Sequence, residues 1–238
     1  MFPSLPWKGF TLDWFFGKGP KMIGLFHDEA NLRGIATSFK VAICVSVLST
    51  IVGTMAAFLF EQEDFRFKKA LYFLMLTPLV IPGVILGISI LLFTNTLGIF
   101  IEDRFGVYLK CLSPSFWLVV VGQFSFITTI VTLIISARLK KFDSTLEEAA
   151  LNLGATRFEV IRLITLRYLR PSIMGSMAIS FLMSFENFNT TLFLVGAKST
   201  LPINLYQQVR DGSTPVINAI SFILIIATAC IAVATLYS

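Results

Sequence analysis

The chain has 238 residues, of which 55% are hydrophobic and only 14% are charged, and its mean hydropathy is +0.81. A soluble globular domain usually carries about 25% charged residues, so the composition excludes that class and indicates a membrane protein. Basic loops on one side of a membrane account for the net charge of +5. The charge therefore does not imply nucleic acid as a partner.

Long apolar runs follow one another along the chain, at residues 41–60, 71–93, 116–135, 172–194 and 216–236. Each reaches the roughly 20 residues that an α-helix needs to cross a membrane. Lipid cannot hydrogen-bond the backbone, so spanning segments fold as helices, and the alternating pattern of a membrane barrel is not seen. We therefore predict an all-α membrane protein, a multi-span helical bundle with five visible spans.

The segment before the first run, residues 1–37, contains no stretch apolar enough to cross a membrane. It also lacks the basic start, apolar core and small-residue cleavage site of a signal peptide. We expect an extracytoplasmic segment over 1–37, with an amphipathic helix over 22–37 lying along the membrane surface. Such a segment normally follows an earlier spanning helix, which we expect to be absent from this chain. The transmembrane domain would then cover 38–238.

Basic residues are concentrated in the loop between the third and fourth runs. Residues 137–170 contain Arg138, Lys140, Lys141, Arg157, Arg162, Arg167 and Arg170. Short loops rich in Lys and Arg stay in the cytoplasm. We therefore place loop 137–170 on the cytoplasmic side.

This cytoplasmic loop is predicted to form two short helices joined by a bend at Gly154, which can adopt the left-handed conformation that ends a helix. Two pairs have the spacing of a capping box: Ser144 with Glu147, and Thr156 with Glu159. At helical spacing, one face of the first helix holds Leu146, Ala149, Ala150 and Leu153, and the inward face of the second holds Phe158, Ile161 and Ile164. Local physics leaves two alternatives, a docking surface for a soluble partner or an elbow that packs only against the chain's own spans.

The same loop resembles the signature loop of permease subunits of binding-protein-dependent ATP-driven (ABC) importers. The family pattern is Glu-Ala-Ala, three residues, Gly, nine residues, then Ile-x-Leu-Pro. The chain supplies Glu148, Ala149, Ala150, Gly154, Ile164 and Leu166 in register. Arg167 stands where proline is usual. The resemblance implies the type I importer permease fold, in which a sixth, N-terminal span is common.

The resemblance also implies a mechanism. The first short helix would dock into a groove on a nucleotide-binding subunit, with coupling residues Glu148, Ala149, Ala150 and Gly154. The implied partners are two nucleotide-binding ATPase subunits, a second homologous permease subunit and a periplasmic solute-binding protein at the bacterial inner membrane. ATP and Mg²⁺ would bind to the ATPase subunits, so no cofactor or metal is expected in this chain.

Within this family the chain most resembles the polyamine (spermidine/putrescine) permeases of the C type. The matching segments are Thr77-Pro78, 138–143, Ser180-Phe181, 201–203 and 215–219. These segments also occur in permeases for other solutes, so ferric iron, phosphonates and amino-acid-like solutes are alternative substrates.

Candidate residues for a translocation pathway lie in the second and fourth runs. Pro78 and Pro82 each remove a backbone donor and can kink a helix, which suits a gate but also occurs in static helices. Glu186 is the one charge in its run, and Asn187 and Asn189 follow it. A charge at the centre of a span costs about 2.5–3.5 kcal/mol. Glu186 would therefore face a water-filled, cation-attracting path, or else lie near the outer membrane face.

Two other functional classes are considered. An enzyme is disfavoured because the sequence has no Gly-x-x-x-x-Gly-Lys-Ser/Thr phosphate loop, a single histidine (His27) and no metal-binding pattern of His, Cys and carboxylates. A self-sufficient channel or ion-coupled secondary transporter is the alternative to an importer subunit. Such proteins often carry paired ionisable groups within their spans, whereas the runs here contain only Glu186.

Overall fold

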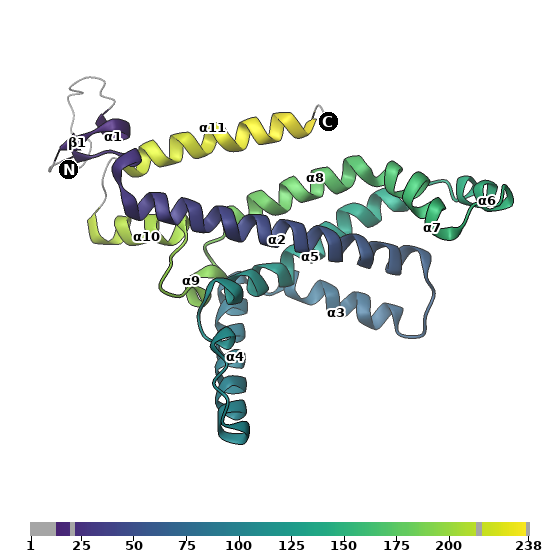
Figure 1. Ribbon diagram of the computed structural model, residues 1–238, viewed down its shortest axis with the longest axis horizontal. Helices are drawn as coiled ribbons and strands as arrows, with labels where there is room; N and C mark the ends of the chain where they lie inside the picture. Colours follow the sequence, from purple (N-terminus) through teal and green to yellow (C-terminus); the bar gives the residue numbers. More distant parts are fainter. Residues whose placement is uncertain (1–12, 20–21, 213–215, 237–238) are drawn as a thin grey trace.

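The computed structural model describes residues 13–19, 22–212 and 216–236. Its centre is a bundle of three long helices, α2 (Glu29–Gln62), α5 (Phe116–Leu139) and α8 (Leu166–Phe185), which pack lengthwise against one another (Figure 1). Strand structure within the described ranges is limited to one antiparallel pair, β1 (Lys18–Gly19) and β2 (Met22–Ile23). The predicted all-α architecture is confirmed.

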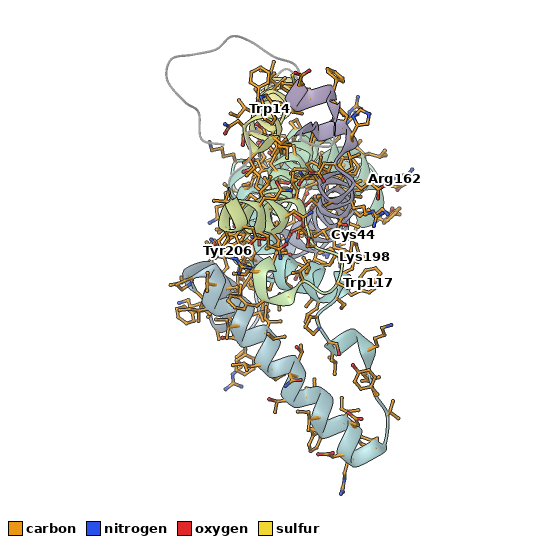
Figure 2. The ribbon with its side chains drawn as sticks, turned by 90° about the vertical axis from the view of Figure 1, so that its left-hand side faces the viewer. Trp14, Cys44, Trp117, Arg162, Lys198 and Tyr206 are labelled. Carbon is orange, nitrogen blue, oxygen red and sulfur yellow. The ribbon has the colours of Figure 1, made fainter. Side chains whose placement is uncertain are left out.

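The other helices surround this bundle. They are α1 (Asp13–Phe16), η1 (Leu25–His27), α3 (Lys68–Val80), α4 (Gly83–Phe105), η2 (Lys110–Leu112), α6 (Thr145–Asn152), α7 (Arg157–Val160), η3 (Ile161–Thr165), α9 (Thr191–Leu194), α10 (Leu201–Gly212) and α11 (Val216–Leu236). Helix α6 lies at one end of the bundle, and α1 and α10 lie toward the other (Figure 1). Helix α4 projects away from the bundle, and the view along the long axis shows the same separation (Figure 2).

By length and composition, three helices of the described part are apolar and long enough to cross a membrane, namely α2, α4 and α5. Helix α11 contains a shorter apolar stretch, Val216–Cys230. Helix α8 is 20 residues long and carries Arg167 and Arg170 in its first turns. All five apolar runs are therefore helical, but two of them are interrupted.

The run 71–93, predicted as one span, is broken between α3 and α4. Ile81 ends α3 with extended backbone angles, φ −77° and ψ 127°, because the ring of a following proline disfavours the α conformation. Pro82 then forms the N-cap of α4. Pro78 remains inside α3, so only the second of the two prolines ends a helix.

The run 172–194, also predicted as one span, is broken after Glu186, the C-cap of α8. The Asn187 side chain explains the break, because its Oδ1 accepts hydrogen bonds from the Thr191 backbone N–H (3.3 Å) and hydroxyl (3.0 Å). A short polar side chain that bonds nearby backbone competes with helix continuation. The chain turns over residues 186–190 and resumes as α9.

The amphipathic helix predicted over 22–37 does not form as a separate element. Residues 29–37 are the first turns of the 34-residue α2. Asp28 starts this helix, since its Oδ1 accepts from the backbone N–H groups of Ala30 (3.0 Å) and Asn31 (3.2 Å). Residues 1–12 and 20–21 of the predicted extracytoplasmic segment lie outside the described residues.

The interface of α2, α5 and α8 combines branched apolar side chains, such as Val45 and Ile127, with small residues. Its buried hydroxyl residues include Ser46, Ser49, Thr128, Thr132, Ser176, Ser180 and Ser184. A Cβ added to Gly53 of α2 would lie 2.7 Å from Val131 Cγ1 of α5, so the two helices approach closely here. Small residues are the usual basis of helix association in lipid. The outer face of α2 is apolar and exposed, as at Met55 (67%), and suits contact with lipid.

Candidate functional site

The loop 137–170 protrudes from the end of the bundle as two short helices with a bend between them (Figure 1). Helix α6 ends at Asn152, and Gly154 has a φ of +91°. Only glycine adopts such an angle without strain, and a Cβ at this position would meet no atom within 4 Å. The prediction of a helix, a bend at Gly154 and a second helix is confirmed.

The two predicted capping boxes differ in outcome. The box of Thr156 and Glu159 is present: Glu159 Oε2 accepts from the Thr156 backbone N–H at 2.8 Å, and the Glu159 N–H donates to Thr156 Oγ1 at 3.3 Å. The box of Ser144 and Glu147 is absent, because the Ser144 side chain makes no cap bond. Asp143 stabilises this start instead, accepting from the Thr145 hydroxyl (2.8 Å) and backbone N–H (3.0 Å).

These bonds lower the pKa of both carboxyl groups. For Asp143 the hydroxyl of Thr145 is the larger cause and its backbone N–H the second. For Glu159 the backbone N–H of Thr156 comes first and the hydroxyl second. Hydrogen bonds to a carboxylate favour its charged form, so both caps carry negative charge at neutral pH.

Glu147, which the sequence motif does not single out, anchors α6 to the bundle. Its Oε1 accepts a hydrogen bond from the Thr165 hydroxyl of η3 and lies 3.4 Å from Nε2 of Gln62 at the end of α2. The same glutamate lines a cavity of about 550 Å³ between the loop and the end of α2. Glu148 and Ala149 are exposed and Ala150 is half-buried. Glu147 therefore faces the bundle, and Glu148 and Ala149 are accessible to a partner.

The loop exposes large apolar side chains. The exposed set is Leu146 (52%), Leu151 (41%), Leu153 (89%), Phe158 (70%), Ile161 (38%) and Leu163 (62%). The prediction that Phe158 and Ile161 point inward is wrong; Val160 is buried instead and Ile164 is half-buried. Helical spacing places residues on one face but does not decide which face meets the bundle. A rimmed apolar patch of this kind marks an interaction surface.

The second half of the loop joins α8 through a turn of π-helix, η3. Arg167, at the position where proline is usual in the family, lies inside α8. Near this junction the Arg138 guanidinium lies 4.3 Å from the centre of the Tyr168 ring. The Phe142 ring also packs on Tyr168, with 5.1 Å between the two ring centres. Both ends of the loop are therefore attached to the same part of α8.

The structure brings three of the five candidate pathway residues together. Pro78, Asn187 and Asn189 line one cavity of about 250 Å³, between the α3–α4 break and the 186–190 turn. Its other lining residues are Leu79, Ile81, Gly83, Leu86, Phe126, Ile130, Met183 and Thr190. The lining is uncharged, with polar groups gathered on one side.

The other two candidates lie outside this lining. Pro82 sits directly before Gly83, as the N-cap of α4. Glu186 is exposed at the C-terminal end of α8, a position where a charge costs less than at the centre of a span. Within the described ranges, no group of three or more His, Cys, Asp or Glu side chains could hold a metal ion.

An apolar helical bundle with a short exposed helix pair at one end is the arrangement that the resemblance to importer permease subunits implies. The family model "binding-protein-dependent transport system inner membrane component" matches residues 32–238. The chain belongs to this family.

Individual relatives agree. The chain is 31% identical over 221 residues to the putrescine transport system permease protein PotI of Escherichia coli K12, covering 92% of this chain and 74% of that protein. It is 27% identical over 231 residues to the spermidine/putrescine transport system permease protein PotC of Haemophilus influenzae, covering 97% and 82%.

Solved structures share the fold. A bacterial ABC transporter that imports the acidic polysaccharide alginate superposes with a TM-score of 0.75 at 16% identity, over 99% of this chain and 83% of that chain. The MetNI methionine ABC transporter in an inward-facing form gives a TM-score of 0.62 at 17% identity, over 87% and 91%. The predicted type I importer permease fold is confirmed.

Proposed function

We propose that this permease subunit moves a polyamine, such as putrescine or spermidine, across the bacterial inner membrane by alternating access. A solute-binding protein delivers the solute to this subunit and a second, homologous permease. Two ATPase subunits bind ATP and Mg²⁺ and drive the change of state. ATP hydrolysis takes place on those subunits and not on this chain.

The relatives PotI and PotC support a polyamine as the solute, and the observation that carries the coupling to an ATPase is the exposed surface of α6. Glu148 and Ala149 are accessible and lie beside the apolar side chains of Leu146 and Leu153. Small residues let a partner approach closely, while a neighbouring carboxylate can form charge-assisted hydrogen bonds with it. Gly154 sets the bend that presents this surface. These features support assigning Glu148, Ala149, Ala150 and Gly154 as the coupling residues.

The cavity lined by Pro78, Asn187 and Asn189 is our candidate for part of the solute route. Ammonium groups only donate hydrogen bonds, so the Asn189 amide oxygen and the Thr190 hydroxyl are the groups of this wall that can replace water around a polyamine. The apolar remainder of the wall binds the solute weakly enough to release it. Glu186 and Pro82 lie at the borders of this route. Glu186 would attract a cation at its rim rather than bind one within it.

The test is ATP-dependent uptake by vesicles containing this chain with its permease, ATPase and binding-protein partners. Thermal stabilisation of the binding protein by polyamines, ferric complexes, phosphonates and amino acids selects the solute. We expect polyamines to stabilise it, and uptake to need ATP and to be abolished by Glu148→Arg. Uptake by this chain without an ATPase would instead indicate a self-sufficient channel or secondary transporter.

A further inference from the structure

A chain of buried hydrogen bonds connects the middle of α5 to the turn that lines the candidate solute route. Its centre is Gln123, which is 1% exposed. Gln123 Nε2 donates to Thr191 Oγ1 at 2.8 Å, and its Oε1 accepts from the Ser184 hydroxyl. One amide therefore joins α5 to the last turn of α8 and to the start of α9.

The chain continues from Thr191 to the cavity wall. The Thr191 hydroxyl accepts from Gln123 and donates to Asn187 Oδ1, which also accepts from the Thr191 backbone N–H. An amide oxygen has two lone pairs, so both acceptor sites of Asn187 are occupied. Asn187 therefore cannot accept from an ammonium group of the solute; its bonds instead hold the turn that carries Asn189 and Thr190 in the cavity lining.

Two glycines also pack closely against the turn. A Cβ on Gly87 of α4 would lie 2.7 Å from the Thr190 carbonyl oxygen, and one on Gly122 of α5 would lie 3.4 Å from Thr190 Cγ2. The Thr190 hydroxyl is buried without a hydrogen-bond partner and lines the same cavity. The turn is thus held both by close contacts with these glycines and by the hydrogen bonds that begin at Gln123.

We propose that Gln123 is a positioning residue for solute passage, because through Thr191 and Asn187 it fixes the 186–190 turn, and with it Asn189 and Thr190, at the cavity wall without lining the cavity itself. This proposal rests on the proposed role of that cavity as part of the solute route. A purely packing role would not require an amide, since burying one is unfavourable unless its groups are paired. A leucine would fill similar space but could neither donate to Thr191 nor accept from Ser184.

Cysteine labelling tests the positioning directly and does not depend on the solute. The assembled transporter is prepared in vesicles with the native Cys44, Cys111 and Cys230 replaced by serine and with Asn189→Cys as reporter. Gln123→Leu should change the rate at which a water-soluble maleimide labels the reporter cysteine by about fivefold. This is the factor by which one ordinary hydrogen bond shifts an equilibrium.

The matched control is Thr128→Val, on the same helix. Thr128 is also buried, and its hydroxyl contacts Ser49 of α2 at 3.2 Å, away from the turn. We expect Thr128→Val to leave the labelling rate unchanged. An unchanged rate in Gln123→Leu, or an equal change in both variants, would overturn the proposal.

Uptake of radiolabelled putrescine separates positioning from general damage. Gln123→Leu should lower the maximal rate about fivefold, with an unchanged half-saturating concentration, which the binding protein sets, and an unchanged amount of assembled complex. Altered labelling with unaltered uptake kinetics would overturn the role in passage. If the unsubstituted transporter takes up no putrescine, the proposed solute is wrong, and the labelling rates alone decide the role of Gln123.

Discussion

Glu147 accepts a hydrogen bond from the Thr165 hydroxyl, so the first residues of α6 are tied to the turn of π-helix that leads into α8. The adjacent Glu148 is exposed. The two neighbouring glutamates thus face different ways. Glu147 fixes the loop to its own bundle, and Glu148 is available to a partner. Displacement of α6 by a partner would be passed to α8 through Glu147.

Glu147→Ala should loosen α6 without removing its outward surface. Loss of the Thr165 and Gln62 contacts should speed amide exchange in α6 about fivefold, equivalent to about 1 kcal/mol of local stability. Uptake should fall while the ATPase subunit still binds. Hydrogen exchange by mass spectrometry measures the first effect. Glu148→Ala is the control, for which we expect unchanged exchange; equal acceleration in both variants would contradict the anchoring role.

Gly154→Ala should strain the bend, because its φ of +91° is unfavourable by about 1–2 kcal/mol for a residue with a Cβ. We expect lower ATP-driven uptake, and a less sharply defined C-terminal end of α6. Gly175→Ala in α8 is the matched control: it too has open space around a Cβ, but its φ is not positive. Equal uptake by the two variants would show that the left-handed angle is not needed.

Gly87→Ala should push α4 away from the 186–190 turn. The added Cβ would lie 2.7 Å from the Thr190 carbonyl oxygen, and overpacking of this kind costs about 1–3 kcal/mol. Thermal unfolding of the purified complex in detergent should show a lower midpoint. Gly98→Ala, whose Cβ would meet Leu112 at an ordinary 3.8 Å, should leave the midpoint unchanged or raise it.

The capping box of Thr156 and Glu159 should open in acid. Its hydrogen bonds lower the pKa of Glu159 below the ordinary value of 4.5, so the carboxylate stabilises the cap above that value. The stabilisation is lost as the pH falls through the lowered pKa. Amide exchange at residues 156–160, corrected for its intrinsic pH dependence, should show lost protection only in that acid range. Glu159→Gln should abolish this dependence; its persistence would assign it to another group.

Local features of the fold could be predicted from the sequence. The bend at Gly154 and the cap at Thr156 depend on neighbours a few residues away, and both are present. The single-span predictions for 71–93 and 172–194 failed at Pro82 and Asn187. A hydropathy average over an apolar run counts a proline or an asparagine as a single value. It does not include the effect of that residue on the backbone.

The anchoring contacts could not be predicted in this way, because their partners are distant in the sequence. Glu147 meets Gln62 across 85 positions, and Gln123 meets Thr191 across 68. The sequence does contain one signal of this kind, since Gln123 is the one amide side chain in the uncharged run 116–135. A strong hydrogen-bonding side chain in a span needs a partner on another helix.

Crosslinking from α6 tests the central claim, that an ATPase subunit acts on this surface. Ala149→Cys is introduced into the cysteine-free chain, and actively importing vesicles are treated with a short thiol crosslinker. We predict capture of the nucleotide-binding subunit from position 149, with a yield that changes on adding ATP. Ala197→Cys, exposed in the α9–α10 connection, should capture none. If vesicles that import solute give no ATPase crosslink from position 149, the account is contradicted.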